Sequence, residues 1–136
     1  MARAAQALVG ARFRLHGRDP ASGLDCVGVV AVALGDDAVP TGYALRGGDP
    51  VRIGALLDAR LSRADGRCVG DVLLFAVGAG QLHLAVASGA VASGAIASGG
   101  RFVHADAGLG RVVERGGVAP WVLIGAWRRQ DGRGDG

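Results

Sequence analysis

The chain has 136 residues, half of them hydrophobic, and a formal net charge of +3 from 15 Lys or Arg against 12 Asp or Glu. This length and apolar content suit a single domain with a substantial core, and they exclude a chain that is disordered over its bulk. The charge is small, the arginines are scattered, and aromatic residues make up only 4% of the chain, so a nucleic-acid-binding surface is not expected.

The first half of the chain is predicted to be helical. An amphipathic pattern predicts a helix over about Ala2 to Val9, and an apolar stretch predicts a second helix from Cys26 to about Leu34. Gly35-Asp36-Asp37 ends that helix, and a loop punctuated by Pro and Gly follows. A third helix is predicted from Pro50 to Leu61, with Asp49 as its N-cap.

The second half of the chain has a strand-like pattern. The predicted strands are Val72 to Val77, Gln81 to Ala87, Arg101 to Ala105, Arg111 to Glu114 and Trp121 to Arg128. Helices followed by such strands predict an α+β domain with an antiparallel sheet, spanning residues 1–129. The polar, glycine-rich tail of residues 130–136 is expected to be disordered.

A short repeat separates two of these strands. Between Ala85 and Gly99 a five-residue unit rich in Ala, Ser and Gly occurs three times. We interpret the segment as an expanded hairpin loop, which either overhangs the candidate site or is a surface insertion without function. The second interpretation is favoured because lengthening a loop costs little stability.

Cys26 is the most informative residue. It lies where a polar, glycine-containing loop meets an apolar helix, and a helix N-terminus favours the thiolate, which is the nucleophilic form. His83 and His104 follow, each inside a predicted strand, which is the chain order of papain-like cysteine hydrolases. The alternatives are a buried structural thiol with two core histidines, or a zinc site, which the lack of closely spaced ligand pairs disfavours.

The second cysteine, Cys68, precedes a predicted strand and has no loop-to-helix setting that would activate it. We expect a buried or partly exposed structural thiol. Two cysteines do not make a disulfide framework, and a disulfide between Cys26 and Cys68 would abolish the chemistry expected of Cys26. A reducing compartment fits this cysteine usage.

Five segments of the chain carry a family resemblance. They are Ala7 to Gly28, Gly70 to Phe75, Gln81 to Val86, Phe102 to Ala105 and Ile124 to Arg128. In this order they resemble the motifs of the NlpC-type cell-wall cysteine peptidases, and the match covers almost the whole chain. The short members that this chain resembles most are encoded with phage tails or gene transfer agents.

The resemblance implies a papain-like NlpC-type fold, in which N-terminal helices, one with the catalytic cysteine at its N-terminus, pack on an antiparallel sheet. Cys26 would be the nucleophile, and His83 would act first as general base and then as general acid. His104 would accept a hydrogen bond from the far ring nitrogen of His83 and fix its tautomer. Backbone N–H groups near the start of the Cys26 helix would hold the oxyanion.

Two further residues are expected to bind substrate. Asp25 is expected to cap the Cys26 helix, and the resemblance implies that it also helps to bind the free amine of a peptide substrate; a simple N-cap and this additional role both remain open. Phe13 stands where the family usually has a tyrosine that lines the site, so a hydroxyl contact is absent. Val27 replaces the usual serine, and His16 replaces a glycine.

The resemblance implies that the protein cleaves amide bonds of peptidoglycan stem peptides through a thioester acyl-enzyme. The bond expected is the one between the γ-carboxyl of D-glutamate and a diamino acid. Neither a cofactor nor a metal is expected. The partners would be stem peptides and the structural proteins of a phage tail or gene transfer agent. The alternatives are an amidase or acyltransferase on the same thiol fold and a non-catalytic tail assembly module.

The N-terminal residues have too short an apolar core for a signal peptide. No run approaches the roughly 20 apolar residues of a membrane span. We therefore expect a chain that is made in the bacterial cytoplasm without a signal peptide, and that a particle delivers to the cell wall.

Overall fold

The computed structural model describes residues 1–40, 45, 47–78, 80–89, 100–117 and 119–130. Its helices are α1 (Ala2–Gln6), α2 (Cys26–Leu34) and α3 (Pro50–Asp58). Its strands are β1 (Arg18–Asp19), β2 (Gly23–Leu24), β3 (Ser62–Arg63), β4 (Val72–Ala76), β5 (Leu82–Ala87), β6 (Arg101–Asp106), β7 (Arg111–Gly116) and β8 (Val122–Arg128). Within these residues, no helix is long and apolar enough to cross a membrane.

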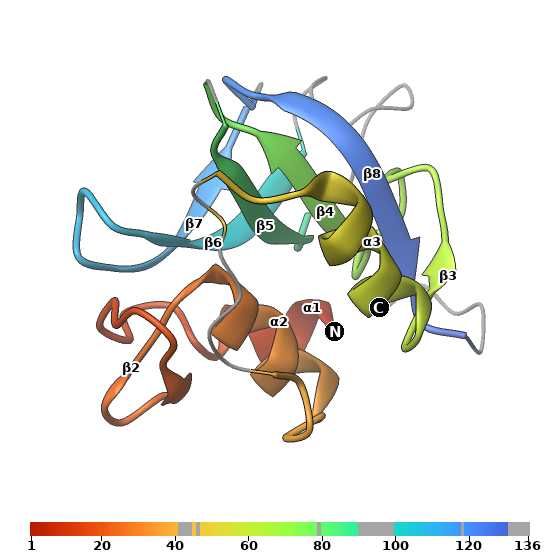
Figure 1. The fold of residues 1–136 in the computed structure, drawn as a ribbon. Helices are drawn as coiled ribbons and strands as arrows, with labels where there is room; N and C mark the ends of the chain where they lie inside the picture. Colours follow the sequence, from red (N-terminus) through yellow and green to blue (C-terminus); the bar gives the residue numbers. More distant parts are fainter. Residues whose placement is uncertain (41–44, 46, 79, 90–99, 118, 131–136) are drawn as a thin grey trace.

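Six of these strands form one antiparallel sheet in the order β3-β8-β4-β5-β6-β7. The short strands β1 and β2 pair separately with each other. Figure 1 shows α1 and α2 together on one side of the sheet, with α3 beside β8. The predicted α+β class with an antiparallel sheet is therefore confirmed.

Two predicted helices are shorter in the structure. The first ends at Gln6 rather than Val9, because the Val9 N–H donates to the Gln6 carbonyl three residues back, as in a tight turn. The third helix ends at Asp58 rather than Leu61. Leu61 instead lies in the turn that leads to β3, and its side chain is buried. The two-residue strands β1, β2 and β3 were not predicted, because they are too short to show a period of two. Most of the Ala/Ser/Gly repeat and of the tail lies outside the described residues.

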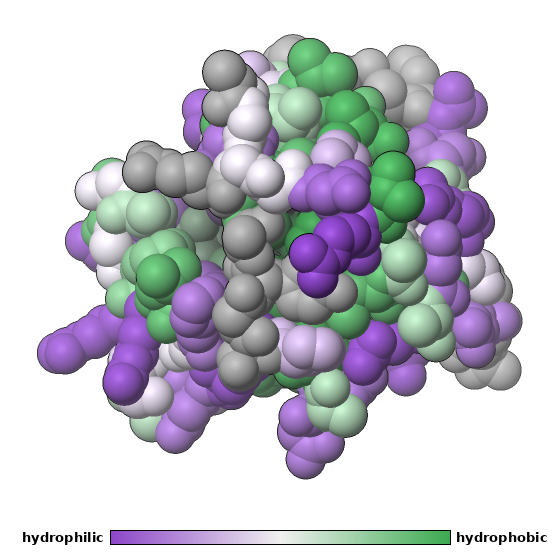
Figure 2. Space-filling view, viewed as in Figure 1, coloured by the Kyte–Doolittle hydropathy of each residue, from purple (hydrophilic) through white to green (hydrophobic). Residues whose placement is uncertain are grey.

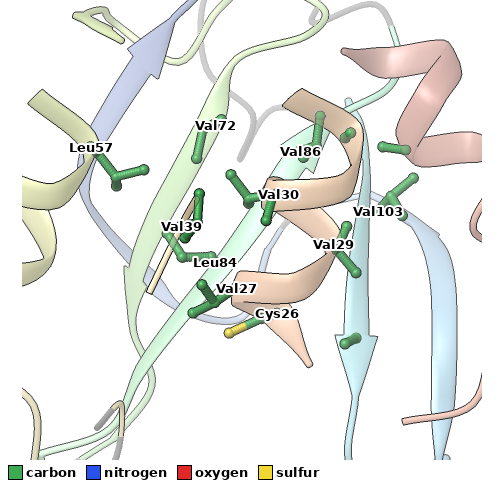
Figure 3. Close-up of a cluster of buried hydrophobic side chains, with 14 of the residues drawn as sticks. Cys26, Val27, Val29, Val30, Val39, Leu57, Val72, Leu84, Val86 and Val103 are labelled. Carbon is green, nitrogen blue, oxygen red and sulfur yellow. The ribbon is translucent and has the colours of Figure 1, made fainter. Parts of the chain in front are cut away.

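Helix α2 is fixed by the core on nearly all sides. Seven of its nine residues are buried, and it packs mainly against α1 and β5 and also against β1 and β6. Figure 3 shows Val29 and Val30 of this helix among Val86 of β5 and Val103 of β6. Each fully buried side chain of this size contributes about 1.5–3 kcal/mol of hydrophobic free energy. The position of Cys26 is therefore set by core packing.

The sheet also buries apolar side chains on its other face. Strand β4 shows this, since Val72 and Leu74 join the core under α2 whereas Leu73 and Phe75 join a second cluster. In the view of Figure 2, apolar residues gather over the region of β8 and α3, with hydrophilic residues around them. Val122 of β8 is 67% exposed, so the helices leave this end of the sheet partly uncovered.

The loop before α2 packs closely on the helix and leaves no space for a side chain at Gly17 or Gly28. A Cβ on Gly28 would collide with the carbonyl oxygen of Gly17, and a Cβ on Gly17 would collide with the carbonyl of Gly23. Glycine is therefore required two residues after Cys26, where it lets the loop backbone touch the helix. This contact brings the loop to the N-terminal end of α2.

We predict that Gly28→Ala destabilises the protein by about 1–3 kcal/mol, because overlap with a backbone atom forces the loop away from the helix. Alanine has the better helix propensity, so a purely local effect would have the opposite sign. Thermal or denaturant unfolding measures the change. Gly116→Ala is the matched control, since a Cβ there meets only Arg101 at 3.5 Å. Equal stability of the two variants would contradict the prediction.

Candidate active site

All five residues predicted for the site line one cavity of about 630 Å³. They are Phe13, Asp25, Cys26, His83 and His104. They come from the loop before α2, the start of α2, and strands β5 and β6. The structure therefore brings together residues that are far apart in the sequence.

Cys26 is the first residue of α2 and is only 3% exposed. The first turn of a helix has N–H groups without partners inside the helix. Here the Asp25 side chain takes one of them, since it accepts from Gly28 N–H, while the Val29 N–H donates to the Asp25 carbonyl as the first bond of the helix. The N–H groups of Cys26 and Val27 face the sulfur of Cys26, and their hydrogen bonds to it act to lower the pKa of the thiol. These two donors therefore lie beside the reactive atom.

The sequence predicted that the start of the helix favours the thiolate form of Cys26, and this prediction is wrong. Burial raises the pKa of the Cys26 thiol to about 12, and the nearby negative charge of Asp25 acts in the same direction. Backbone N–H groups, chiefly that of Leu84, lower the pKa, but by less. A helix N-terminus alone would favour the thiolate, but the loss of water around the sulfur outweighs it. The resting group is a neutral thiol.

The two histidines are directly bonded. Nε2 of His83 lies 2.8 Å from Nδ1 of His104, with the ring planes at 89°. Burial lowers the pKa of His83 to about 4 and also lowers that of His104 below its ordinary value. Both imidazoles are therefore neutral near pH 7. Within the described residues, the buried Nε2 of His104 has no hydrogen-bond partner.

The histidines project from the sheet at a gap between strands. Within the described residues β5 and β6 pair only at Val86–Val103 and Ala87–Phe102, so the part of β5 from Leu82 to Ala85, which contains His83, is not paired with β6. By alternation His83 and His104 point to the face of the second apolar cluster, whereas Leu84 points toward α2. The cavity that Cys26 shares with the histidines joins the two faces here. No hydrogen bond joins Cys26 to His83 within this described region.

Asp25 is the N-cap of α2, as predicted, and a role in binding a substrate amine stays a prediction. It is 4% exposed, and its carboxylate accepts from the N–H groups of Gly28 and His16, each at 2.8 Å. Arg18 also donates to it at 3.2 Å and forms an ion pair. The carboxylate therefore ties the loop, the helix and one arginine together.

His16 and Phe13 lie in the same loop. His16 has φ 61°, in the left-handed region that glycine adopts without cost, which accounts for the glycine that the resembling family has at this position. Its side chain lines the cavity. Phe13 donates its N–H to the Gly110 carbonyl at 2.8 Å and is half-buried, so its ring forms part of the apolar wall.

Two lining residues were missed from the sequence. The Trp121 ring lies edge-on to His83 and His104, at centroid distances of 5.1 and 5.3 Å. Nothing in its spacing could have indicated this. Asp106 also lines the cavity. It lies two residues after His104 on the same strand, a spacing that places both on one face and that could have identified it.

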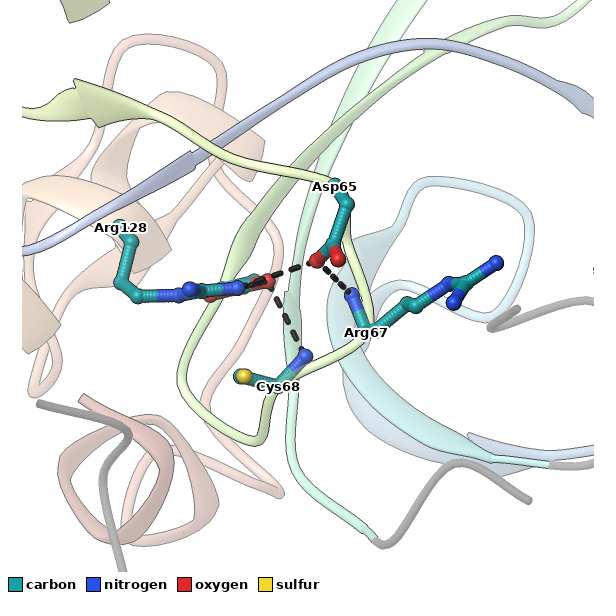
Figure 4. A network of polar contacts seen from close by, with 5 residues as sticks. Asp65, Arg67, Cys68 and Arg128 are labelled. Atoms are coloured by element: carbon teal, nitrogen blue, oxygen red, sulfur yellow. Dashed lines mark hydrogen bonds and ion pairs between the residues drawn. The ribbon is translucent and has the colours of Figure 1, made fainter. Parts of the chain in front are cut away.

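Cys68 lies elsewhere, in the polar network that Figure 4 shows. Its N–H donates to the buried carboxylate of Asp71, which accepts two further bonds from Arg128 at 2.7 and 2.9 Å. Cys68 does not line the cavity, and both cysteines are free. The network joins the start of β4 to the end of β8, which suits the structural role predicted for this segment.

In the part of the chain that the structure describes, no three His, Cys, Asp or Glu side chains are arranged to share a metal ion. Comparisons of the chain with protein-family models, with curated proteins and with solved structures found no match. The resemblance to NlpC-type peptidases therefore stays a prediction from the sequence.

We predict that alkylation of Cys26 by iodoacetamide accelerates about tenfold per pH unit between pH 6 and 9. A thiol with a pKa of about 12 is only about one part in ten thousand thiolate at pH 8, and that fraction grows with pH. Mass spectrometry of the Cys26 peptide gives the rate, with Cys68 as the internal control. A rate that is already constant from pH 5 to 8 would show a preformed thiolate–imidazolium pair and contradict the prediction.

Proposed function

We propose that this chain is a papain-like cysteine hydrolase of the NlpC type that cleaves amide bonds of peptidoglycan stem peptides. The bond proposed is the one between the γ-carboxyl of D-glutamate and a diamino acid. One observation carries the proposal: Cys26, at the start of α2, shares a cavity with a His83–His104 pair bonded at 2.8 Å. The order and spacing of the motifs supply the substrate class by resemblance.

The reaction proceeds through a thioester. Nδ1 of His83 takes the thiol proton as Sγ of Cys26 attacks the amide carbonyl carbon, while Nε2–H of His83 donates to His104. The N–H groups of Cys26 and Val27, which face Sγ in the resting site, would hold the oxyanion as it forms beside the sulfur, and one such donor is worth about 3 kcal/mol. The C–N bond then breaks as His83 protonates the leaving amine. Water, deprotonated by His83, hydrolyses the thioester and frees the thiol.

The protonation states agree with this sequence of steps. The pKa of Cys26 is raised to about 12 and that of His83 is lowered to about 4, so thiol and imidazole are both neutral before substrate binds. Proton transfer therefore accompanies attack instead of preceding it. Hydrogen bonds between a nucleophile and its base are often long or poorly aligned in substrate-free sites and tighten when substrate binds.

The setting that we propose is a phage tail or gene transfer agent, in which the particle carries the enzyme to the cell wall. A second candidate is a non-catalytic tail module that keeps the fold. The buried thiol favours that candidate, because a group with a pKa of about 12 that has no hydrogen bond to His83 within the described residues is not activated at rest. Activity measurements separate the two.

We predict that the wild-type protein releases new amine and carboxylate ends from purified peptidoglycan fragments, and that Cys26→Ala releases none. Mass spectrometry of the products identifies the bond cleaved. Cys68→Ala is the matched control, since its thiol lies outside the cavity, and we expect it to keep the wild-type cleavage pattern.

Absence of cleavage by folded wild-type protein would contradict the proposal and favour the non-catalytic module. Equal cleavage by Cys26→Ala would assign the activity to another group or to a contaminant. Labelled acyl groups that accumulate on Cys26 from non-peptide donors would favour the acyltransferase alternative.

A further inference from the structure

We infer that Asp106 forms a subsite for a primary ammonium group of the bound molecule. The inference rests on the proposed function for the identity of that molecule, a stem peptide whose diamino acid carries a free side-chain amine. The binding chemistry itself follows from the cavity, and it is tested separately below.

The carboxylate of Asp106 is held in place with one oxygen open. Asp106 ends β6, two residues after His104 and on the same face of the strand. Its Oδ1 accepts from the Leu109 N–H at 3.0 Å. Within the described residues no partner engages Oδ2, and the residue is half-buried in the cavity wall. A fixed carboxylate with a free oxygen is a ready acceptor for a cationic donor.

Asp106 is also the cavity-lining carboxylate that has no ion-pair partner among the described residues. The other lining carboxylate, Asp25, is neutralised by its ion pair with Arg18. Apart from the histidines, no basic side chain lines the cavity among the described residues. On β7, Arg111 is the cross-strand partner of Asp106 and Arg115 lies over the Trp121 ring, but in the described structure neither forms an ion pair with Asp106.

These features select an ammonium group over other cations. A single open oxygen suits a compact –NH₃⁺ donor, whereas a guanidinium prefers a carboxylate with both oxygens free. Cross-linking converts the side-chain amine of a stem peptide to an amide. The subsite would therefore direct the enzyme to stems that are not cross-linked.

The first test compares two substrates with two enzymes. The substrates are the tetrapeptide L-Ala-γ-D-Glu-L-Lys-D-Ala and the same peptide acetylated on the lysine side chain. Hydrogen bonds to charged groups contribute about 1.5–3 kcal/mol, so we expect wild type to prefer the free amine by about 10- to 100-fold in kcat/KM. Asp106→Asn keeps an acceptor for Leu109 N–H, and its preference should fall to nearly one. Any effect of Asp106→Asn on the histidine pair changes kcat/KM for both peptides alike, so it cancels in the ratio of the two values.

The second test needs no turnover. Cys26→Ala protein, with and without Asp106→Asn, is titrated with Nα-acetyl-L-lysine amide and with Nα-acetyl-L-norleucine amide while the Trp121 indole signal is followed by NMR. We expect the lysine probe to bind at least tenfold more tightly than the norleucine probe, and Asp106→Asn to abolish the difference.

The two tests separate the two proposals. If wild type cleaves no peptide but Asp106→Asn abolishes the selective binding of the lysine probe, the proposed function fails and the ammonium subsite stands. If the lysine probe shows no preference, or keeps its preference in Asp106→Asn, the subsite is overturned whether or not the chain hydrolyses peptides.

Discussion

The candidate site depends on one buried carboxylate, that of Asp25. It caps the helix that carries Cys26, and it accepts the N–H of His16, which holds the loop in a left-handed turn at the cavity. Arg18 pairs with it and also donates to the Pro40 carbonyl at 2.8 Å, which ties in the chain beyond α2. A buried carboxylate is stable only when such donors satisfy it. Loop, helix and cavity wall therefore form one unit around this group.

Asp25 is buried as part of an ion pair, whereas burial keeps the reactive groups Cys26, His83 and His104 uncharged. The pKa of Cys26 is raised and those of His83 and His104 are lowered, all mainly because water is excluded. A neutral thiol is a poor target for oxidants and alkylating agents, so the resting site is protected. In the reaction that we propose, these groups would become reactive when a substrate brings an electrophilic carbon to the sulfur and an oxygen to the N–H groups at the start of the helix.

The sequence predicted those features that local patterns determine. Asp25 and Asp49 are recognisable as N-caps because a short acceptor side chain precedes an apolar helix, and the longer strands follow from their apolar content. The direction of the Cys26 pKa was not predictable, since the sequence reveals the helix terminus but not how completely the sulfur is buried. Trp121 was also missed, because it reaches the histidines only through the pairing of β8 with β4.

The central claim is that His83 offers Nδ1 as the base because its Nε2–H is donated to His104. Long-range ¹H–¹⁵N NMR of the imidazole rings at neutral pH measures this directly, since it identifies which ring nitrogen carries the proton. The account predicts a neutral His83 protonated on Nε2, with Nδ1 unprotonated. A proton on Nδ1 of His83, with Nε2 accepting from His104, would contradict it, because the nitrogen needed to take the thiol proton would already be occupied.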